Sequence, residues 1–221
     1  MKRITTVLFD MDGLLVDTEA PSVVAWKRAA EQFGESIDDE ILLSLIGRHA
    51  GDCLAILGEH LGIDLKKAGF LERYDDIYLS NFMRNGIEVK QGGVSLLTEL
   101  SEQQVPRAVV TSSKRELAPR KLRLAELEHF FDLIVTGCEV EKSKPEPDIF
   151  LLAAEKLDVD PSQCVVLEDS YNGVRAAHRA GMNPVMIPDL LQPTDEMKEL
   201  TTAIYSSLEE AAPFILNLLR N

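Results

Sequence analysis

Acidic residues stand in close pairs at two points of the sequence, each directly after an apolar run. Asp10 and Asp12 form the first pair, and Glu168 and Asp169 form the second. Two carboxylates two residues apart can share the work of phosphoryl transfer, because one can attack phosphorus while the other moves a proton. The second pair would repel the first unless a hard cation such as Mg²⁺, which prefers oxygen ligands, neutralised both. The two pairs together therefore predict metal-assisted phosphoryl chemistry.

Each pair also has an ordinary structural interpretation. Asp and Gly are frequent in surface turns, which could explain the first pair and the glycine that follows it at Gly13. Asp169 or Ser170 could simply cap the helix predicted to begin near Asn172. Taken alone, the second pair fits a helix cap as well as a metal site, and its combination with Asp10 is what favours the metal.

Hydroxyl and basic residues occupy two further segments. Thr111, Ser112 and Ser113 follow another apolar run, where hydroxyls, backbone amides and the start of the next helix can hold phosphate oxygens. Lys114 comes shortly after them and could extend this anion site or face solvent. Lys144 lies in the run KSKPEP, whose prolines fix the backbone before a predicted helix. It could balance carboxylate and phosphate charge from there, although a single lysine is most often a solvated surface residue.

Six short apolar runs predict the strands that position these residues. Continuous apolar runs of this length are typical of strands buried on both faces of a parallel sheet. They cover residues 4–9, 108–110, 133–135, 165–167, 184–187 and 203–205. Helical patterns alternate with them, at 93–103, 115–127, 147–156, 172–180 and 208–219. The alternation predicts a doubly wound, Rossmann-like α/β fold, in which ligands bind outside the carboxyl ends of the strands.

The stretch 18–87 breaks this alternation, because it shows helical patterns alone. They cover residues 19–33, 41–46, 52–61 and 66–85, and glycines separate them. We therefore expect two domains. Residues 1–17 and 88–221 would form the α/β core, and residues 18–87 would form a helical cap inserted after the first strand.

Composition argues against several classes of function. The 221 residues carry 23 Lys plus Arg against 37 Asp plus Glu, a formal net charge of −14. This balance argues against nucleic acid and membrane lipid as partners, because both attract clustered basic residues. Three scattered cysteines, at Cys53, Cys138 and Cys164, argue against a disulfide framework and suit a reducing cytoplasm. No apolar run approaches the roughly 20 residues that span a bilayer, so we expect a cytoplasmic protein.

Four motifs, in this order and at this spacing, resemble those of the haloacid dehalogenase-like hydrolase superfamily. They are DMDGLLVDTE, VVTSSK, KSKPEPDIF and VVLEDSYNG, and the resemblance covers the whole chain. It is closest to the branch with a helical cap after the first strand, which includes sugar-phosphate phosphatases and β-phosphoglucomutase-like enzymes. The resemblance implies a Mg²⁺-dependent enzyme that works through an aspartyl-phosphate.

The resemblance also implies roles for individual residues. Asp10 matches the nucleophile, and Asp12 matches the general acid/base, whose backbone carbonyl is also a metal ligand in the family. Lys144 matches the lysine that bridges nucleophile and phosphate, and Thr111 matches the residue that binds the transferring phosphoryl group. The implied Mg²⁺ ligands are Asp10, Asp12 and Asp169, with Glu168 as a direct or water-mediated partner.

The substrate side of the site is defined less closely. Arg48, in the loop IGRHAGD of the predicted cap, matches a position where family members present a basic residue to the substrate. Together with Thr111, Ser112 and Lys114 it is expected to bind the substrate. A small phosphorylated metabolite is the expected partner, with a sugar phosphate as its class, and a monomer is the default for this architecture.

Three functions remain open on this basis. A phosphatase fits best, and a phosphomutase is the alternative, because Lys114 and Arg48 could hold a second phosphate. β-Phosphoglucomutases that resemble this chain carry a His in the first cap helix where this sequence has Ser22, which favours hydrolysis. A catalytically silent binding module is the third function, and the complete set of acidic and basic residues argues against it.

Overall fold

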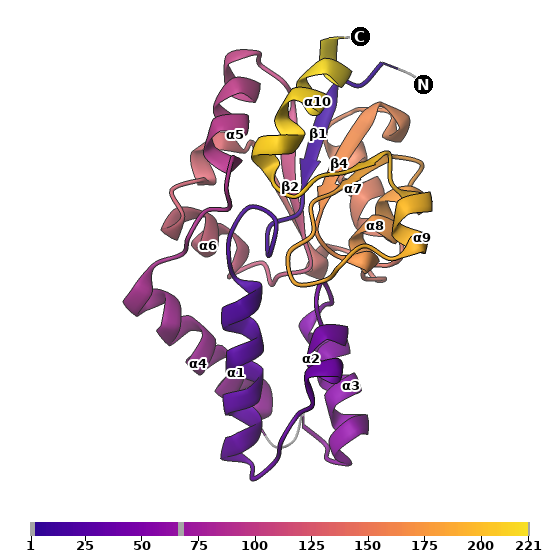
Figure 1. Ribbon diagram of the computed structural model, residues 1–221. Coiled ribbons are helices and arrows are strands. Elements are labelled where there is room, and N and C mark those ends of the chain that lie inside the picture. The colour runs from indigo at the N-terminus through magenta and orange to yellow at the C-terminus, as the bar shows by residue number, and fades with distance from the viewer. Residues whose placement is uncertain (1–2, 66–68, 221) are drawn as a thin grey trace.

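The computed structural model describes residues 3–65 and 69–220, and its centre is a six-stranded parallel sheet (Figure 1). The strands are β1 Thr6–Phe9, β2 Arg107–Thr111, β3 Leu133–Thr136, β4 Cys164–Glu168, β5 Asn183–Met186 and β6 Ala203–Ile204. Their order in the sheet is β3-β2-β1-β4-β5-β6. The order reverses at β1, which lies between β2 and β4, and ligands bind at the carboxyl ends beside such a reversal.

Helices cover both faces of the sheet. On one face lie α5 Gly93–Glu102, α6 Ala118–Leu124 and α10 Leu208–Arg220, and on the other lie α7 Asp148–Lys156 and α8 Tyr171–Arg179. Alternating residues of β1 supply both cores, because Val7 and Phe9 pack with the first group of helices and Leu8 packs with the second. This confirms the doubly wound α/β fold that the apolar runs predict.

Some elements differ from the sequence-based prediction. α6 is shorter than the predicted helix at 115–127, because Glu126 takes a positive φ of 58° just beyond its end. Four short elements carry no periodic apolar pattern and escape prediction: α9 Asp195–Leu200 and the 3₁₀ turns η1 Glu128–Phe130, η2 Gly137–Glu139 and η3 Pro161–Gln163. α9, for example, buries Met197 and no other residue of its own.

The cap is a group of helices that extends away from the sheet (Figure 1). It contains α1 Glu19–Gln32, α2 Asp39–Ser44, α3 Ala50–Leu61 and α4 Phe70–Asn85, and the start of the helix predicted from residue 66 lies outside the described residues. A separate apolar cluster holds these helices together. At its centre the ring of Trp26 stacks on that of Tyr74, with centroids 3.8 Å apart. The inserted helical cap is thus present as predicted.

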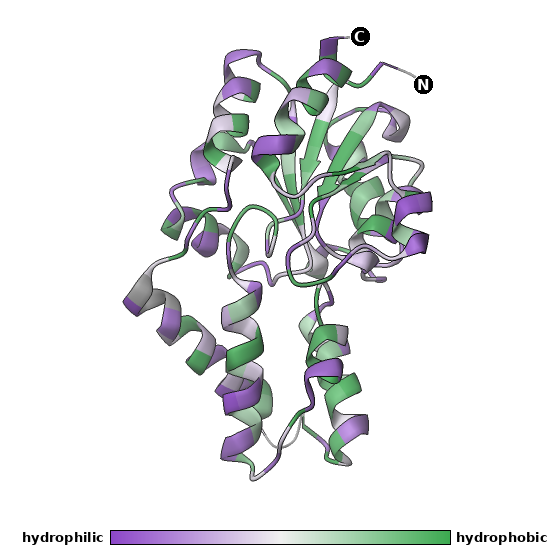
Figure 2. Cartoon of the chain, in the orientation of Figure 1, coloured by the Kyte–Doolittle hydropathy of each residue, from purple (hydrophilic) through white to green (hydrophobic). Residues whose placement is uncertain are grey.

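Hydropathy follows this architecture. In Figure 2 the strands of the sheet are strongly hydrophobic, whereas the cap helices alternate hydrophobic and hydrophilic residues along their length. The cap helices are therefore amphipathic, with one side for packing and another for solvent. Within residues 3–65 and 69–220, no helix combines the length and the apolar character that a membrane crossing requires.

Two short segments connect the cap to the sheet, and they run side by side. Val16 forms an isolated antiparallel bridge with Val89, and Asp17 N donates to the carbonyl of Glu88 at 2.9 Å. Lys90 Nζ lies 3.6 Å from Asp17 Oδ1. The chain therefore enters and leaves the cap at one place, close to the carboxyl end of β1.

Candidate active site

The predicted chemical residues converge at the carboxyl ends of neighbouring strands. Asp10 directly follows β1, Thr111 ends β2, and Glu168 ends β4 with Asp169 directly after it. These three strands are adjacent in the sheet. Lys144 comes from the loop before α7 and reaches the same edge. Residues from four distant segments thus form one site.

Asp10 and Lys144 form a buried ion pair at the centre of this site. Lys144 Nζ lies 2.6 Å from Asp10 Oδ1 and 2.7 Å from Glu168 Oε1, and it also donates to the carbonyl of Val110 at 3.0 Å. Burial raises the pKa of Asp10 to about 7, although Lys144 opposes the shift. Burial lowers the pKa of Lys144, but the two carboxylates outweigh it and raise this pKa overall. The lysine is therefore charged and fixed on the carboxylate.

Glu168 is fully buried, and both of its carboxylate oxygens are engaged. Oε1 accepts from Lys144, and Oε2 accepts from the backbone N of Ser170 at 3.2 Å and from its hydroxyl at 2.9 Å. Gly173 lies directly against the carboxylate, since a Cβ atom there would come within 1.8 Å of Oε1. These contacts indicate that Glu168 holds Lys144 in place. They argue against direct binding of a metal ion by Glu168.

Asp169 is not used to cap the helix that follows it. Ser170 caps α8 by accepting a hydrogen bond from Gly173 N at 3.1 Å. The Asp169 carboxylate is 2% exposed and has no hydrogen bond or ion pair among the described residues. It packs on Gly13, where φ is +83° and a Cβ atom would lie 2.5 Å from Oδ2. Burial and nearby carboxylates, Glu168 first among them, raise the pKa of Asp169 well above its usual range.

The donors at this edge suit a hard divalent cation. Asp10 and Asp169 each keep a carboxylate oxygen that no described residue binds, and both carboxyls are buried beside like charges. No group of three His, Cys, Asp or Glu side chains within the described ranges could hold a metal ion alone. Mg²⁺ typically binds through one or two carboxylates and completes its shell with other oxygens, including water and phosphate. The two carboxylates of Asp10 and Asp169 therefore match the number of side-chain ligands that this ion commonly takes.

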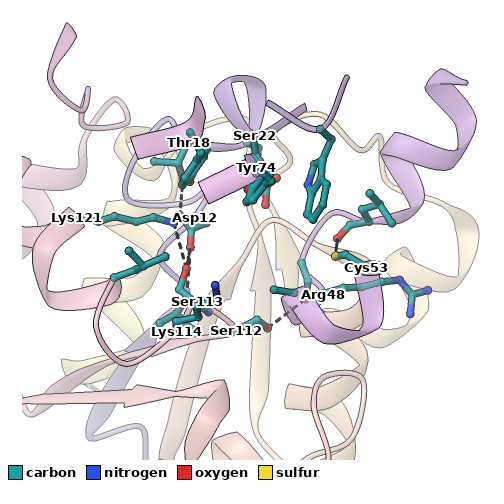
Figure 3. A pocket seen from close by; sticks show the side chains of 18 of the residues that line it. Asp12, Thr18, Ser22, Arg48, Cys53, Tyr74, Ser112, Ser113, Lys114 and Lys121 are labelled. Atoms are coloured by element: carbon teal, nitrogen blue, oxygen red, sulfur yellow. Dashed lines mark hydrogen bonds and ion pairs between the residues drawn. The ribbon is translucent and has the colours of Figure 1, made fainter. Parts of the chain in front are cut away.

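Asp12 is held by four polar side chains, of which Thr111 is the most distant, at 3.4 Å from Oδ2, and the other three are labelled in Figure 3. Lys121 Nζ lies 2.6 Å from its Oδ1, Thr18 donates to the same oxygen at 2.5 Å, and Ser113 donates to Oδ2 at 2.7 Å. Burial raises the pKa of Asp12, but Lys121 and these hydrogen bonds outweigh it and lower this pKa overall. The Lys121 ammonium also lies 4.9 Å from the ring centre of Tyr78. Core and cap therefore both fix the position of Asp12.

A cavity of about 100 Å³ opens beside Asp12, between the sheet edge and the cap. Asp10, Thr111 and Ser112 line it from the core side. Thr111 accepts a hydrogen bond from Ser113 N at 3.0 Å, and Ser112 donates to the carbonyl of a cap residue, Gly47, at 3.2 Å. The predicted phosphate-binding hydroxyls thus lie on the same cavity as Asp10.

The two predicted cations of the substrate side also line this cavity, but both have partners. Lys114 Nζ lies 2.6 Å from Asp75 Oδ2 of α4. Arg48 donates through Nε to the carbonyl of Ser44 at 2.7 Å, and its guanidinium points away from Asp12 in Figure 3. The structure therefore places Lys114 and Arg48 at the site without directing either cation to Asp10.

Three residues of the site are missing from the sequence-based prediction. Lys121 and Thr18 bind Asp12, and Glu19 lines the cavity with 9% of its surface exposed. Burial, with Asp12 as the next cause, raises the pKa of Glu19 to about 8. No local signal marks Lys121, because Arg123 has the same apolar neighbour Leu122 in this short helix and yet is exposed.

The family comparison agrees with this geometry. The model for haloacid dehalogenase-like hydrolases matches residues 7–187, which include every polar residue described above. The chain belongs to this family. As a haloacid dehalogenase-like hydrolase it is an enzyme, and named phosphatases are among its relatives.

The comparisons include a named phosphatase and solved structures of the same fold. A phosphorylated carbohydrates phosphatase of Thermotoga maritima is 34% identical over 182 residues, covering 81% of this chain and 82% of that protein. A variant of CbbY from Rhodobacter sphaeroides, solved with xylulose-(1,5)bisphosphate, is 26% identical with a TM-score of 0.82, covering 94% of this chain and 96% of that one. A β-phosphoglucomutase of Clostridium difficile shares the fold, with 24% identity, a TM-score of 0.85 and coverage of 98% and 97%.

Proposed function

We propose that this hydrolase is a Mg²⁺-dependent phosphatase of small phosphorylated metabolites, with sugar phosphates as its substrate class. The observation that carries the proposal is the state of Asp10. Lys144 holds its Oδ1 at 2.6 Å, while its Oδ2 has no partner in residues 3–65 and 69–220, at a cavity that Asp12 also lines. A carboxylate fixed at one oxygen and open at the other is suited to nucleophilic attack. The relative that hydrolyses phosphorylated carbohydrates supports the substrate class.

The reaction has two steps. In the first, a carboxylate oxygen of Asp10 bonds to phosphorus in line with the leaving oxygen, and the P–O bond breaks. Lys121 and the hydrogen bonds to Asp12 keep its pKa low in the free enzyme, so the proton that Asp12 gives to the leaving oxygen is one that it takes up with the incoming phosphate ester. In the second, Asp12 takes a proton from water, and the resulting hydroxide attacks phosphorus and releases Asp10 and inorganic phosphate. The same carboxyl thus acts as acid and then as base. Its partners Lys121, Thr18 and Ser113 keep it in place between the steps.

Charge stabilisation comes from the surrounding groups. Lys144 balances the charge of Asp10 and of the phosphoryl oxygens, and Thr111 and Ser112 offer hydroxyl and backbone donors to them. When bound, Mg²⁺ would neutralise further charge on the phosphoryl oxygens. Asp10, Asp169 and the backbone carbonyl of Asp12 would hold this ion, and Glu168 would keep Lys144 in place.

We further infer that residues 18–87 move as a cap against residues 1–17 and 88–221. Only two segments cross between these units, and they pair through Val16 with Val89 and through Asp17 with Glu88. The cap also contacts the core through the Lys114–Asp75 ion pair at 2.6 Å. Closure over the cavity would exclude bulk water until the leaving group has departed.

A phosphomutase would need a place for a second phosphate. Ser22, which stands where the related mutases carry a His, is hydrogen-bonded to the Tyr74 hydroxyl at 2.9 Å. Lys114 is paired with Asp75, and Arg48 points away from Asp12. These contacts favour hydrolysis. Incubation with a hexose phosphate and a bisphosphate primer distinguishes the two activities, since an isomer without free phosphate would identify a mutase.

Two substitutions test the assignment of the carboxylates. Asp10→Asn should abolish release of phosphate from 4-nitrophenyl phosphate and leave the thermal unfolding curve nearly unchanged. Asp12→Ala should still form the phospho-enzyme with this good leaving group and hydrolyse it slowly, which mass spectrometry of the intact protein can detect. Asp76→Asn, at an exposed position of α4, is the matched control and should keep full activity. Substantial turnover by Asp10→Asn would refute the nucleophile.

Removal of the metal tests the cofactor separately. EDTA should stop phosphate release by the wild-type protein, and Mg²⁺ in excess should restore it. Unchanged activity after exhaustive chelation would contradict the metal dependence. It would not affect the assignment of Asp10 as the nucleophile, which the Asp10→Asn variant tests.

A further inference from the structure

A carboxylate of the cap is paired with a cation of the core across the cavity. Lys114 lies in the loop after β2, and its Nζ is 2.6 Å from Asp75 Oδ2 of α4. Both side chains line the cavity, and they are 27% and 25% exposed. No other described residue binds the Lys114 ammonium by a hydrogen bond or an ion pair. Asp75 is thus the group that neutralises this cation.

Holding the cap on the core does not explain this pair. A partly exposed ion pair contributes little to stability, and Asp75 Oδ1 is buried without a hydrogen bond among the described residues, which costs free energy. Two other contacts already join cap and core at the cavity. Ser143 donates to Asp52 Oδ2 of α3 at 2.7 Å, and Ser112 donates to the carbonyl of Gly47 at 3.2 Å. The position of Asp75 therefore needs another explanation.

The pairing sets the charge that the cavity presents to a leaving group. Lys121 is bound to Asp12, and the guanidinium of Arg48 points away from Asp12 (Figure 3). Lys114 is the remaining cation among the described residues that line the cavity, and Asp75 neutralises it. A leaving group with a negative charge would lose its hydration there without gaining a cation. It would also meet the Asp75 carboxylate as a like charge, which disfavours binding.

We propose that Asp75 is a specificity-determining residue that neutralises Lys114 and so disfavours phosphate esters whose leaving group carries a second negative charge, such as a carboxylate or a second phosphate. This inference rests on the proposed phosphatase function. It adds to that function a choice among phosphate esters, which Asp10 and Asp12 cannot make because they act on the phosphoryl group and the leaving oxygen alone.

Three phosphate esters test the inference. Glycerol 3-phosphate and 3-phosphoglycerate differ in one terminal group, a hydroxymethyl against a carboxylate, and 4-nitrophenyl phosphate has no second charge. Asp75→Asn keeps the shape of the side chain and removes its charge. The ratio of kcat/KM for glycerol 3-phosphate to kcat/KM for 3-phosphoglycerate should then fall about 10- to 100-fold, the effect of a hydrogen bond to a charged group. The values for glycerol 3-phosphate and 4-nitrophenyl phosphate should change by a common factor.

Two further variants show whether Lys114 carries the effect. Lys114→Met in the Asp75→Asn background removes the freed cation and should return the ratio to near its wild-type value. A fall in the ratio that persisted in this double variant would overturn the proposal. Asp76→Asn removes the same charge from the next position of α4, which is exposed, and should leave the ratio as in the wild type.

The remaining outcomes separate this inference from the function beneath it. Equal changes of kcat/KM on all three esters in Asp75→Asn would identify an ion pair that only holds the cap, and would overturn its role in specificity. Wild-type turnover of 3-phosphoglycerate as fast as that of glycerol 3-phosphate would overturn the selection. If the wild type released no phosphate even from 4-nitrophenyl phosphate, the phosphatase function would fail, and this inference with it.

Discussion

Replacing Lys144 by methionine should reveal how much the fold depends on a catalytic side chain. Lys144 is 2% exposed and lies 2.6 Å from Asp10 and 2.7 Å from Glu168, which are 7% and 0% exposed. Methionine has a similar length, so the main loss is the positive charge. Removing one partner of a buried ion pair costs about 3–5 kcal/mol, because a buried charge is left uncompensated. That is a large part of the roughly 5–15 kcal/mol by which typical domains are stable.

Unfolding and kinetics measure the two consequences separately. Thermal unfolding of Lys144→Met should show a midpoint lower by about 6–20 °C, at about 2–4 °C per kcal/mol for a chain of this size. Urea unfolding should give the same loss of free energy without a change in the slope. The rate constant kcat for 4-nitrophenyl phosphate should fall about 10²- to 10³-fold, the usual cost of losing a group that stabilises charge in the transition state.

A second substitution separates the two losses. Glu168→Gln in the Lys144→Met background removes one uncompensated carboxylate, so it should recover about 2 kcal/mol of stability and none of the activity. Lys156→Met breaks an exposed ion pair with Glu139 and should cost no more than about 1 kcal/mol. The reasoning would be refuted if Lys144→Met lowered the free energy of unfolding no more than Lys156→Met does. It would also be refuted if the double variant were no more stable than Lys144→Met alone.

Two further substitutions test particular contacts. Lys121→Met removes the cation 2.6 Å from Asp12, so steady-state kinetics should show kcat for glycerol 3-phosphate lowered about 10- to 100-fold. The loss should be smaller for 4-nitrophenyl phosphate, whose leaving group needs little protonation, and equal losses would contradict the link to Asp12. Gly173→Ala forces a Cβ atom onto the Glu168 carboxylate and should cost at least about 1–3 kcal/mol in urea unfolding. Gly51→Ala, also in the first turn of a helix, should stay within about 1 kcal/mol of the wild type.

The sequence predicts the sheet and its acidic edge because both depend on local patterns. Apolar runs as short as residues 165–167 are buried on both faces, and polar residues directly after them must lie at the carboxyl ends of parallel strands. Asp10, Thr111 and Asp169 could therefore be placed at one edge before their distances were known. The choice between a helix cap and a free carboxylate at Asp169 could not be made this way. It depends on Ser170, whose hydroxyl accepts from Gly173 N and leaves Asp169 uncommitted.

The residues that the sequence does not reveal are those whose role depends on packing between distant segments. Lys121 lies in a short helix far along the chain from Asp12, and only the position of α6 against the sheet edge brings the two to 2.6 Å. Glu19 opens a helix, where an acidic residue is expected for its effect on the helix dipole alone. Arg48 was predicted from its loop, yet the turn that places it at the cavity also directs its Nε to Ser44. Orientation of a side chain is a property of tertiary structure that spacing cannot encode.

The net charge of −14 is a poor guide to how this protein binds an anion, because the balance around Asp10 decides it. The buried or half-buried acids at the site outnumber the buried lysines, with Asp10, Asp12, Glu19, Glu168 and Asp169 against Lys121 and Lys144. Burial first, and then the neighbouring carboxylates of Glu168 and Asp12, raise the pKa of Asp10 to about 7, although Lys144 opposes the shift. A phosphate dianion entering such a site would meet more carboxylates than lysines. Under the proposed Mg²⁺ dependence, a divalent cation held by Asp10 and Asp169 would reverse that sign locally and would let this acidic protein attract an anionic substrate.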